Sequence, residues 1–395
     1  MSFSQLPLSY CTNVHPGLTR DAVLDGLRQF TVPLQANCGG PIAAGLWLAA
    51  PVIKDLLAEA EGPRRFAEAV EKLGLSCHTL NAFPYGDFHS ARVKEQVYLP
   101  DWSDPARTQY TLGCARVLAE LLPSAGEGSL STVPLGFKSL VPALGFLEAA
   151  IEQLLVVARG LAELERRTGK TIRLAIEPEP LCVLETTAET VAFFRLLHGR
   201  AEEFGLLDAV QRHLGVCYDV CHQSVEFEDV AASIRQLADE QIRINKVHIT
   251  CAIDLPNPGR NVAARAALGR YAEPRYLHQT FAQWADGRVA SHLDLSPELA
   301  TAPTADWLAA DRWRIHFHVP VHAERVGELE TTRSDLRRAL ATVRLLDYAP
   351  HLEVETYTWT VFPQDGAEAT SLPLVDGLTA EMLSTRALLD ELGAV

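Results

Sequence analysis

Short apolar runs alternate with longer stretches of helical periodicity along the whole chain. Apolar residues recurring every three to four positions predict helices, the first beginning at the N-cap residue Thr19 and the others at about 51–72, 104–122, 142–168, 187–213, 228–241, 332–346 and 379–392. Between them, eight strands are predicted: Leu6–Asn13, Leu75–Asn81, Leu130–Gly136, Ile172–Glu177, Leu214–Asp219, Ile244–Thr250, Trp313–Val319 and Leu352–Tyr357. Such alternation predicts an α/β fold with a parallel sheet.

Eight strand–helix units predict a (β/α)₈ TIM barrel, with residues 1–395 as one domain. A doubly wound open sheet is the alternative, but residues 6–17 lack the Gly-rich phosphate turn that it would carry after an early strand. Residues 33–50 are interpreted as an insertion or loop. Residues 254–312, between the sixth and seventh predicted strands, are too long for a simple connection and are predicted to form either a lid or a contact surface.

Several predicted strands have one apolar face and one polar or small face. In Ile172–Glu177, for example, Ile, Leu and Ile alternate with Arg, Ala and Glu. The apolar face is suited to packing under helices, and the other face to a barrel interior. Because chemistry in TIM barrels lies at the carboxyl ends of the strands, the residues that end these strands are the candidates for a site.

Four metal-capable residues end the fourth, fifth, sixth and eighth predicted strands: Glu177, Asp219, His248 and Glu355. Three carboxylates and one imidazole suit Mn²⁺, Mg²⁺, Co²⁺ or Fe²⁺, with Zn²⁺ as an alternative. A single strand-end acid is as readily explained as a salt-bridged core residue, but four on matching faces favour one shared cation. Glu179 and Glu353 compete for the same role, and Glu353, one layer deeper than Glu355, is predicted to pair with Arg314 or Arg173.

Further polar residues are predicted to line the same site. His222 is interpreted as a contact to a substrate oxygen, with a fifth metal ligand and a plain helix-start residue as alternatives. The other predicted substrate-binding residues are His78, Asn81, His316, His318 and Glu179. For the histidines, the alternative is an ordinary buried core position.

Composition narrows the classes of protein that fit. With 48% hydrophobic residues the chain can bury a large core, and its net charge of −15 argues against a nucleic-acid partner. Eight cysteines are too sparse for a disulfide framework, so buried reduced thiols are predicted. The N-terminus shows no signal-peptide pattern, and the apolar runs are shorter than a membrane span. We therefore expect a cytoplasmic protein without membrane insertion; its oligomeric state stays open.

The motifs Glu177-Pro178, Asp219-x-x-His222, His248 and Glu355-Thr356 resemble the metal site of the xylose-isomerase-like TIM barrels. That superfamily includes sugar isomerases, ketose 3-epimerases and endonuclease IV. Three longer stretches, at residues 9–17, 79–89 and 353–359, are similar to one subgroup, the EboE-type metabolite traffic proteins. The subgroup name describes a gene-cluster role in metabolite export and does not define a reaction.

The resemblance implies a divalent-metal-dependent isomerase or epimerase that acts on a sugar, polyol or cyclitol-type metabolite. Glu177 and Glu355 would then be the acid/base pair as well as metal ligands, Asp219 and His248 ligands only, and His222 a contact to a substrate oxygen. Two alternatives stay open: a hydrolase or lyase using metal-bound water, which extra metal ligands such as His316 or His318 would favour, and a metabolite-binding barrel without turnover.

Overall fold

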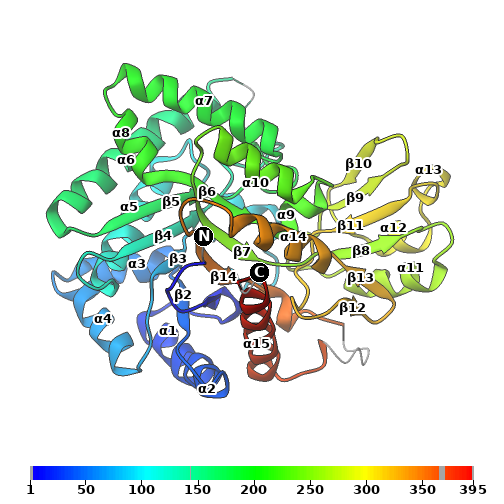
Figure 1. Ribbon diagram of the computed structural model, residues 1–395, viewed down its shortest axis with the longest axis horizontal. Helices are drawn as coiled ribbons and strands as arrows, with labels where there is room; N and C mark the ends of the chain where they lie inside the picture. Colours follow the sequence, from blue (N-terminus) through cyan, green and yellow to red (C-terminus); the bar gives the residue numbers. More distant parts are fainter. Residues whose placement is uncertain (1–2, 143, 364–369, 394–395) are drawn as a thin grey trace.

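The computed structural model describes residues 3–142, 144–363 and 370–393 and contains a closed barrel of eight parallel strands (Figure 1). In order around the barrel these strands are β1 (Ser9–Cys11), β2 (Ala43–Trp47), β3 (Thr79–Asn81), β4 (Glu127–Thr132), β5 (Thr171–Ile176), β6 (Leu214–Asp219), β7 (Ile244–Ile249) and β14 (His351–Val354). The predicted (β/α)₈ TIM barrel in a single domain is confirmed.

Helices surround the barrel and pack against the apolar outer face of its strands (Figure 1). They are α1 (Arg20–Gly26), α2 (Val32–Asn37), α3 (Ala50–Ala58), α4 (Gly62–Lys72), α5 (Pro105–Leu121), α6 (Phe146–Thr168), α7 (Thr187–Glu203), α8 (Leu207–His213), α9 (Val220–Val225), α10 (Val230–Asp239), α14 (Arg333–Val343) and α15 (Leu374–Gly393). The predicted N-cap is confirmed, since Thr19 Oγ1 accepts a hydrogen bond from the backbone N–H of Ala22 at 3.2 Å.

The second barrel strand, β2, falls inside residues 33–50, so their interpretation as a loop or insertion was wrong. All five residues of β2 are buried, and the strand therefore lacks the alternation of apolar and polar residues that marks a half-buried strand. Its composition, Ala-Ala-Gly-Leu-Trp, is also poor in β-branched residues. The predicted second to sixth strands are therefore the third to seventh strands of the barrel.

The seventh predicted strand, Trp313–Val319, is not part of the barrel, which corrects the position of the insertion. Only Arg312–Ile315 is a strand (β11), and it belongs to a second, antiparallel sheet. A strand half-buried in an antiparallel sheet shows the same period of two as a barrel strand, so the pattern does not separate them. The insertion therefore lies between the seventh and eighth barrel strands, not between the sixth and seventh.

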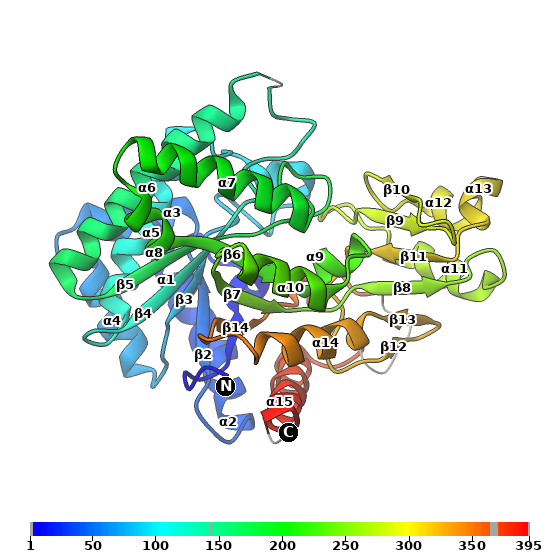
Figure 2. The same cartoon turned by 45° about the horizontal axis from the view of Figure 1, so that its top comes forward.

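This second sheet extends to one side of the barrel (Figure 2). Its strand order is β10 (Val289–His292), β9 (Thr280–Gln283), β11, β8 (Ile253–Pro256), β13 (Leu329–Thr331) and β12 (Arg325–Val326). Three short helices accompany it: α11 (Val262–Leu268), α12 (Pro297–Thr301) and α13 (Ala305–Leu308). The predicted inserted segment 254–312 thus supplies three strands of the sheet, β8, β9 and β10, and residues from 312 to 331 supply the other three.

All eight cysteines are buried and unpaired, as predicted. Within the described part of the chain, no helix combines the length and apolar character needed to cross a membrane.

Candidate active site

Four residues from consecutive barrel strands meet at the carboxyl end of the barrel. Donor atoms of the four lie within 4.8 Å of one another, and all four residues are buried: Glu177, Asp219, His248 and Glu355. They follow or end β5, β6, β7 and β14, which are neighbours around the barrel. The chain therefore brings together the four strand ends that the sequence singled out, now as the fifth to eighth strands.

His248 is at the centre of this group, because its Nδ1 faces all three carboxylates. The distances from Nδ1 are 2.8 Å to Glu177 Oε1, 3.2 Å to Glu355 Oε2 and 3.6 Å to Asp219 Oδ2. The strand pairing sets this arrangement, since His248 on β7 is level with Asp219 on β6.

Neighbouring groups fix the orientation of two of the carboxylates. Glu355 Oε1 accepts hydrogen bonds from the amides of Asn13 at 2.9 Å and Asn81 at 2.7 Å. Asp219 Oδ1 accepts from Thr250 Oγ1 at 2.7 Å and, as the N-cap of α9, from the backbone N–H of His222 at 3.0 Å. In each case one oxygen is held and the other is directed toward His248.

The protonation of the group follows from its burial and its charges. Burial, the largest effect, raises the pKa of Glu177 and Glu355, and the nearby carboxylate of Asp219 adds to the rise. Burial also opposes the ionisation of Asp219, but His222 and His318 lower its pKa below the ordinary value. The pKa of His248 is raised despite its burial, because Cys217 and the carboxylates of Glu177 and Glu355 surround it.

Two carboxylate oxygens of the group have no hydrogen-bond partner among the described residues, although both are buried: Glu177 Oε2 and Asp219 Oδ2. Buried polar atoms without a partner are rare in native proteins. Three carboxylates and one imidazole nitrogen form a donor set that suits a hard or borderline divalent cation. The residues present therefore fit such a cation.

A second layer of charged residues lies beneath the group, inside the barrel. Glu353 pairs with Lys246, the distance from Oε1 to Nζ being 2.7 Å, and both side chains are fully buried. The predicted pairing of Glu353 with Arg314 or Arg173 was wrong. Arg173 pairs with Glu127, and Arg314 lies in the second sheet, where it pairs with Asp335.

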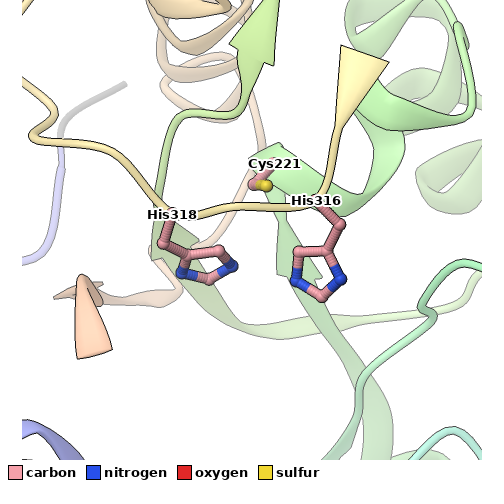
Figure 3. Close-up of side chains that lie close together, drawn as sticks. All are labelled: Cys221, His316 and His318. Atoms are coloured by element: carbon pink, nitrogen blue, oxygen red, sulfur yellow. The ribbon is translucent and has the colours of Figure 1, made fainter. Parts of the chain in front are cut away.

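Three histidines gather beside the carboxylates. His222 Nε2 lies 3.1 Å from His316 Nε2, and His318 Nε2 lies 3.9 Å from Asp219 Oδ2. Figure 3 shows His316 and His318 side by side on the segment after β11, with Cys221 of α9 close to both. Burial lowers the pKa of all three imidazoles, which favours their neutral, ligand-competent form. Burial also raises the pKa of Cys221 well above the usual range, which disfavours its thiolate.

Most of the predicted substrate-binding residues line one pocket at this end of the barrel, where Asn81, Glu179, His222, His316 and His318 are found together with Glu177 and Glu355. His78 is the exception, and its predicted place was wrong. It precedes β3, at the amino end of the barrel, where its ring lies against that of His351, with the two ring centroids 4.8 Å apart. The predicted strand Leu75–Asn81 had placed His78 near the carboxyl end, but β3 begins only at Thr79.

Sequence reasoning missed several residues of the pocket. Asn13 holds Glu355, and Tyr98 donates its hydroxyl proton to Glu179 at 2.7 Å. Gln279, from the insertion, donates to Tyr98 and contacts Nδ1 of His316 at 2.7 Å. Asn13 follows an apolar strand, as the recognised acids do, and this signal was available. Tyr98 ends a short 3-10 helix, Lys94–Tyr98, and Gln279 directly precedes β9, so no long periodic pattern marks either residue.

Comparisons with known proteins bear on the fold. No protein-family model matches the chain, and no curated protein sequence matches it. Among solved structures, a xylose isomerase-like TIM barrel protein from Mycobacterium smegmatis in complex with magnesium is similar, with a TM-score of 0.52, 14% identity and coverage of 100% of this chain and 99% of that one. An L-ribulose 3-epimerase has a TM-score of 0.49 at 12% identity, with coverage of 99% and 96%. The chain therefore shares a TIM-barrel fold with the first of these structures.

Proposed function

We propose that this protein is a divalent-metal-dependent isomerase or epimerase for a polyhydroxylated small molecule, such as a sugar, polyol or cyclitol. The observation that carries the proposal is the arrangement of two buried glutamates, Glu177 and Glu355, whose oxygens lie 2.8 Å and 3.2 Å from Nδ1 of His248 and next to Asp219. In this proposal Glu177, Asp219, His248 and Glu355 hold the cation, which is Mn²⁺, Co²⁺, Mg²⁺ or Zn²⁺.

A cation bound by these residues would polarise the substrate carbonyl and acidify the adjacent C–H bond. One glutamate removes the proton from that carbon, and the other, in its acid form, returns a proton to the opposite face. Burial raises the pKa of both Glu177 and Glu355, whereas a bound cation would favour their ionised form. Asn13 and Asn81 keep Glu355 in place during the transfer.

His222 is assigned to a substrate oxygen. Its Nδ1 lies 3.0 Å from the carbonyl oxygen of Pro178, so it donates there in the neutral form, and its Nε2 faces the pocket beside His316. Glu179, His316 and His318 line the same space and are assigned to substrate hydroxyls. The insertion, which supplies both of these histidines together with Tyr276 and Leu277, is proposed to act as a lid.

A second candidate function is a metal-dependent hydrolase or lyase. It is favoured by one observation: His222, His318 and Asp219 form a further cluster whose donor atoms lie within 4.8 Å of one another, adjacent to the first. A third, a metabolite-binding barrel without turnover, accords with the resemblance to EboE-type metabolite traffic proteins. The eight unpaired cysteines support a reducing, cytoplasmic location for any of the three.

Metal analysis and proton exchange test the proposal. Purified protein is titrated with Mn²⁺ by calorimetry, and Asp219→Asn is expected to lose most of the affinity while keeping its fold, because Asn also serves as an N-cap. Asp229→Asn is the matched control, since Asp229 caps α10 on the surface. Incubation of the metal-loaded protein with a panel of ketoses and keto-cyclitols in D₂O is expected to give deuterium at the carbon beside the carbonyl. Metal binding without exchange across the panel would favour the second or third candidate.

A further inference from the structure

The candidate active-site pocket has two chemically different ends. The inner end presents the carboxylates of Glu177 and Glu355 and the neighbouring histidines. The outer end is formed by apolar and aromatic side chains, among them Phe83, Phe88 and Val93. A substrate that carried hydroxyl groups along its whole length would lose their hydration at the outer end, which is costly. It would find few partners there besides the hydroxyl of Tyr276, which has no hydrogen-bond partner among the described residues.

The aromatic side chains of the outer end form a packed wall. The ring centroids of Phe88 and Tyr276 are 4.9 Å apart, those of Phe88 and Tyr357 are 5.3 Å apart, and those of Tyr276 and Tyr357 are 4.9 Å apart. The three rings come from the loop after β3, from the insertion and from the segment after β14. The wall is therefore assembled from three separate parts of the chain.

Two polar groups near this wall, those of Lys94 and Tyr98, are already engaged. Lys94 also lines the pocket, but its ammonium group donates to the carbonyl oxygens of Glu273 at 2.8 Å and Tyr276 at 2.6 Å and to Asp294 at 2.6 Å. These three bonds use its three protons. The hydroxyl of Tyr98 bonds to Glu179 and Gln279. Neither group is therefore free to receive a sugar hydroxyl.

The candidate pocket shares part of its lining with a second hollow. Four of its residues also line a hollow of about 190 Å³ on the outer side of the same loop: Pro84, Phe88, Val93 and Val97. Leu99, 38% exposed, lies at that hollow as well. Phe88, Val93 and Val97 thus face both the pocket and this hollow.

We propose that the substrate is amphiphilic, with a hydroxylated head at the carboxylates and an alkyl or aryl substituent along the wall of Phe88, Val93 and Val97. This inference rests on the proposed function for the position of the head, and it narrows the substrate class. It distinguishes a substituted polyol or cyclitol from a free sugar.

A series of vicinal diols with a common head and increasing tail tests the proposal. Binding of 1,2-propanediol, 1,2-hexanediol and 1,2-octanediol to the Mn²⁺-loaded protein is measured by calorimetry. Each CH₂ group buried against the wall is expected to tighten binding by about fourfold. Val97→Asp, at a half-buried position that lines both cavities, is expected to flatten this dependence. Val262→Asp, an equal change at a 61% exposed position of α11, is expected to preserve it.

An affinity that does not grow with chain length would overturn the proposal, as would a full chain-length dependence in Val97→Asp. The same titrations without Mn²⁺ separate this inference from the proposed function. If 1,2-propanediol bound equally well with and without Mn²⁺ while affinity still rose with chain length, the result would count against the metal site alone. If Mn²⁺ strengthened the binding of the diols but their affinity did not rise with chain length, the result would count against the amphiphilic substrate alone.

Discussion

Glu353 lies directly beside His248, with its Oε1 3.4 Å from the imidazole Nε2. The two residues are register partners on the neighbouring strands β14 and β7. The other ring nitrogen, Nδ1, faces Glu177, Asp219 and Glu355. A carboxylate on one nitrogen of a histidine fixes which nitrogen is free to bind a metal and how the ring is oriented. We therefore predict that Glu353 positions the ring of His248 for the proposed metal site, through its charge rather than through a hydrogen bond.

Replacing Glu353 by Gln is expected to weaken Mn²⁺ binding by about 10- to 100-fold, because the ring of His248 loses the charge that orients it. Calorimetric titration at a temperature where circular dichroism shows both proteins folded measures the effect. Glu68→Gln, on the exposed face of α4, is the control and should bind Mn²⁺ as the parent does. Equal affinities for Glu353→Gln and the parent would remove the positioning role.

The ion pair beneath the site gives a second prediction, this time for stability. Burial opposes the ionisation of Glu353, but Lys246 and His248 lower its pKa to about 2. Lys246→Met leaves this carboxylate buried and without its cation, and such a change typically costs about 3–5 kcal/mol of unfolding free energy. Urea unfolding measures the loss.

Two further variants test whether the loss of stability in Lys246→Met comes from the unpaired charge of Glu353. The double variant Lys246→Met/Glu353→Gln is expected to recover part of the lost stability, since it removes both charges. Lys54→Met, on the exposed side of α3, should be close to neutral. A loss below about 1 kcal/mol in Lys246→Met would mean that water or another group compensates Glu353.

The third prediction concerns the room that Glu353 needs. A Cβ atom added to Gly45 of β2 would lie 1.6 Å from Glu353 Oε2 and 2.8 Å from Ser9 Oγ. Glu353 is fully buried and bonded to Ser9 and Lys246, so it has little freedom to move away. Gly45→Ala is therefore expected to destabilise the fold by several kcal/mol, of the order of the largest single-residue effects.

The control for Gly45 is Gly199 of α7, where an added Cβ meets nothing within 4 Å. Gly199→Ala is expected to stabilise the protein by up to about 1 kcal/mol, because Ala is the better helix former. Thermal unfolding measures the stability of both variants. Equal changes in stability for Gly45→Ala and Gly199→Ala would contradict the steric argument.

The sequence was sufficient to predict the barrel and the convergence of Glu177, Asp219, His248 and Glu355, because each follows an apolar strand and barrel chemistry occurs at strand ends. The sequence was insufficient to predict β2. Both faces of that strand are buried, so its residues do not alternate between apolar and polar. The sequence also failed for Trp313–Val319, since alternation is the same in a barrel strand and in an antiparallel sheet.

Other parts of the site depend on contacts that no local pattern encodes. The bond between Tyr98 and Glu179 joins residues 81 positions apart, and the pairing of Glu353 with Lys246 depends on the strand order of the closed barrel. His78 was misplaced for a simpler reason. An error of a few residues in where a strand begins moves a side chain from one end of a barrel to the other, because each residue advances the strand by about 3.3 Å.

The fourth prediction follows from Glu381, which attaches α15 to the segment after β14. Its carboxylate accepts hydrogen bonds from Thr356 at 2.6 Å, Trp359 at 2.9 Å and the backbone N–H of Val321 at 3.1 Å. Burial, the largest effect, raises the pKa of Glu381 to about 7. The folded protein therefore keeps a proton on Glu381 over a pH range in which the unfolded chain, with a pKa of about 4.3, has lost it.

Because the folded state binds more protons in that range, the contribution of Glu381 to stability is present below about pH 4 and is lost as the pH rises toward 7. The loss amounts to roughly 4 kcal/mol at 1.36 kcal/mol for each unit of pKa. Urea unfolding at pH 5 and pH 8 is expected to show a smaller decline for Glu381→Gln, whose side chain does not titrate, than for the parent. Glu120→Gln, exposed on α5, should follow the parent. Parallel pH profiles for Glu381→Gln and the parent would show instead that the three donors keep Glu381 ionised throughout this range.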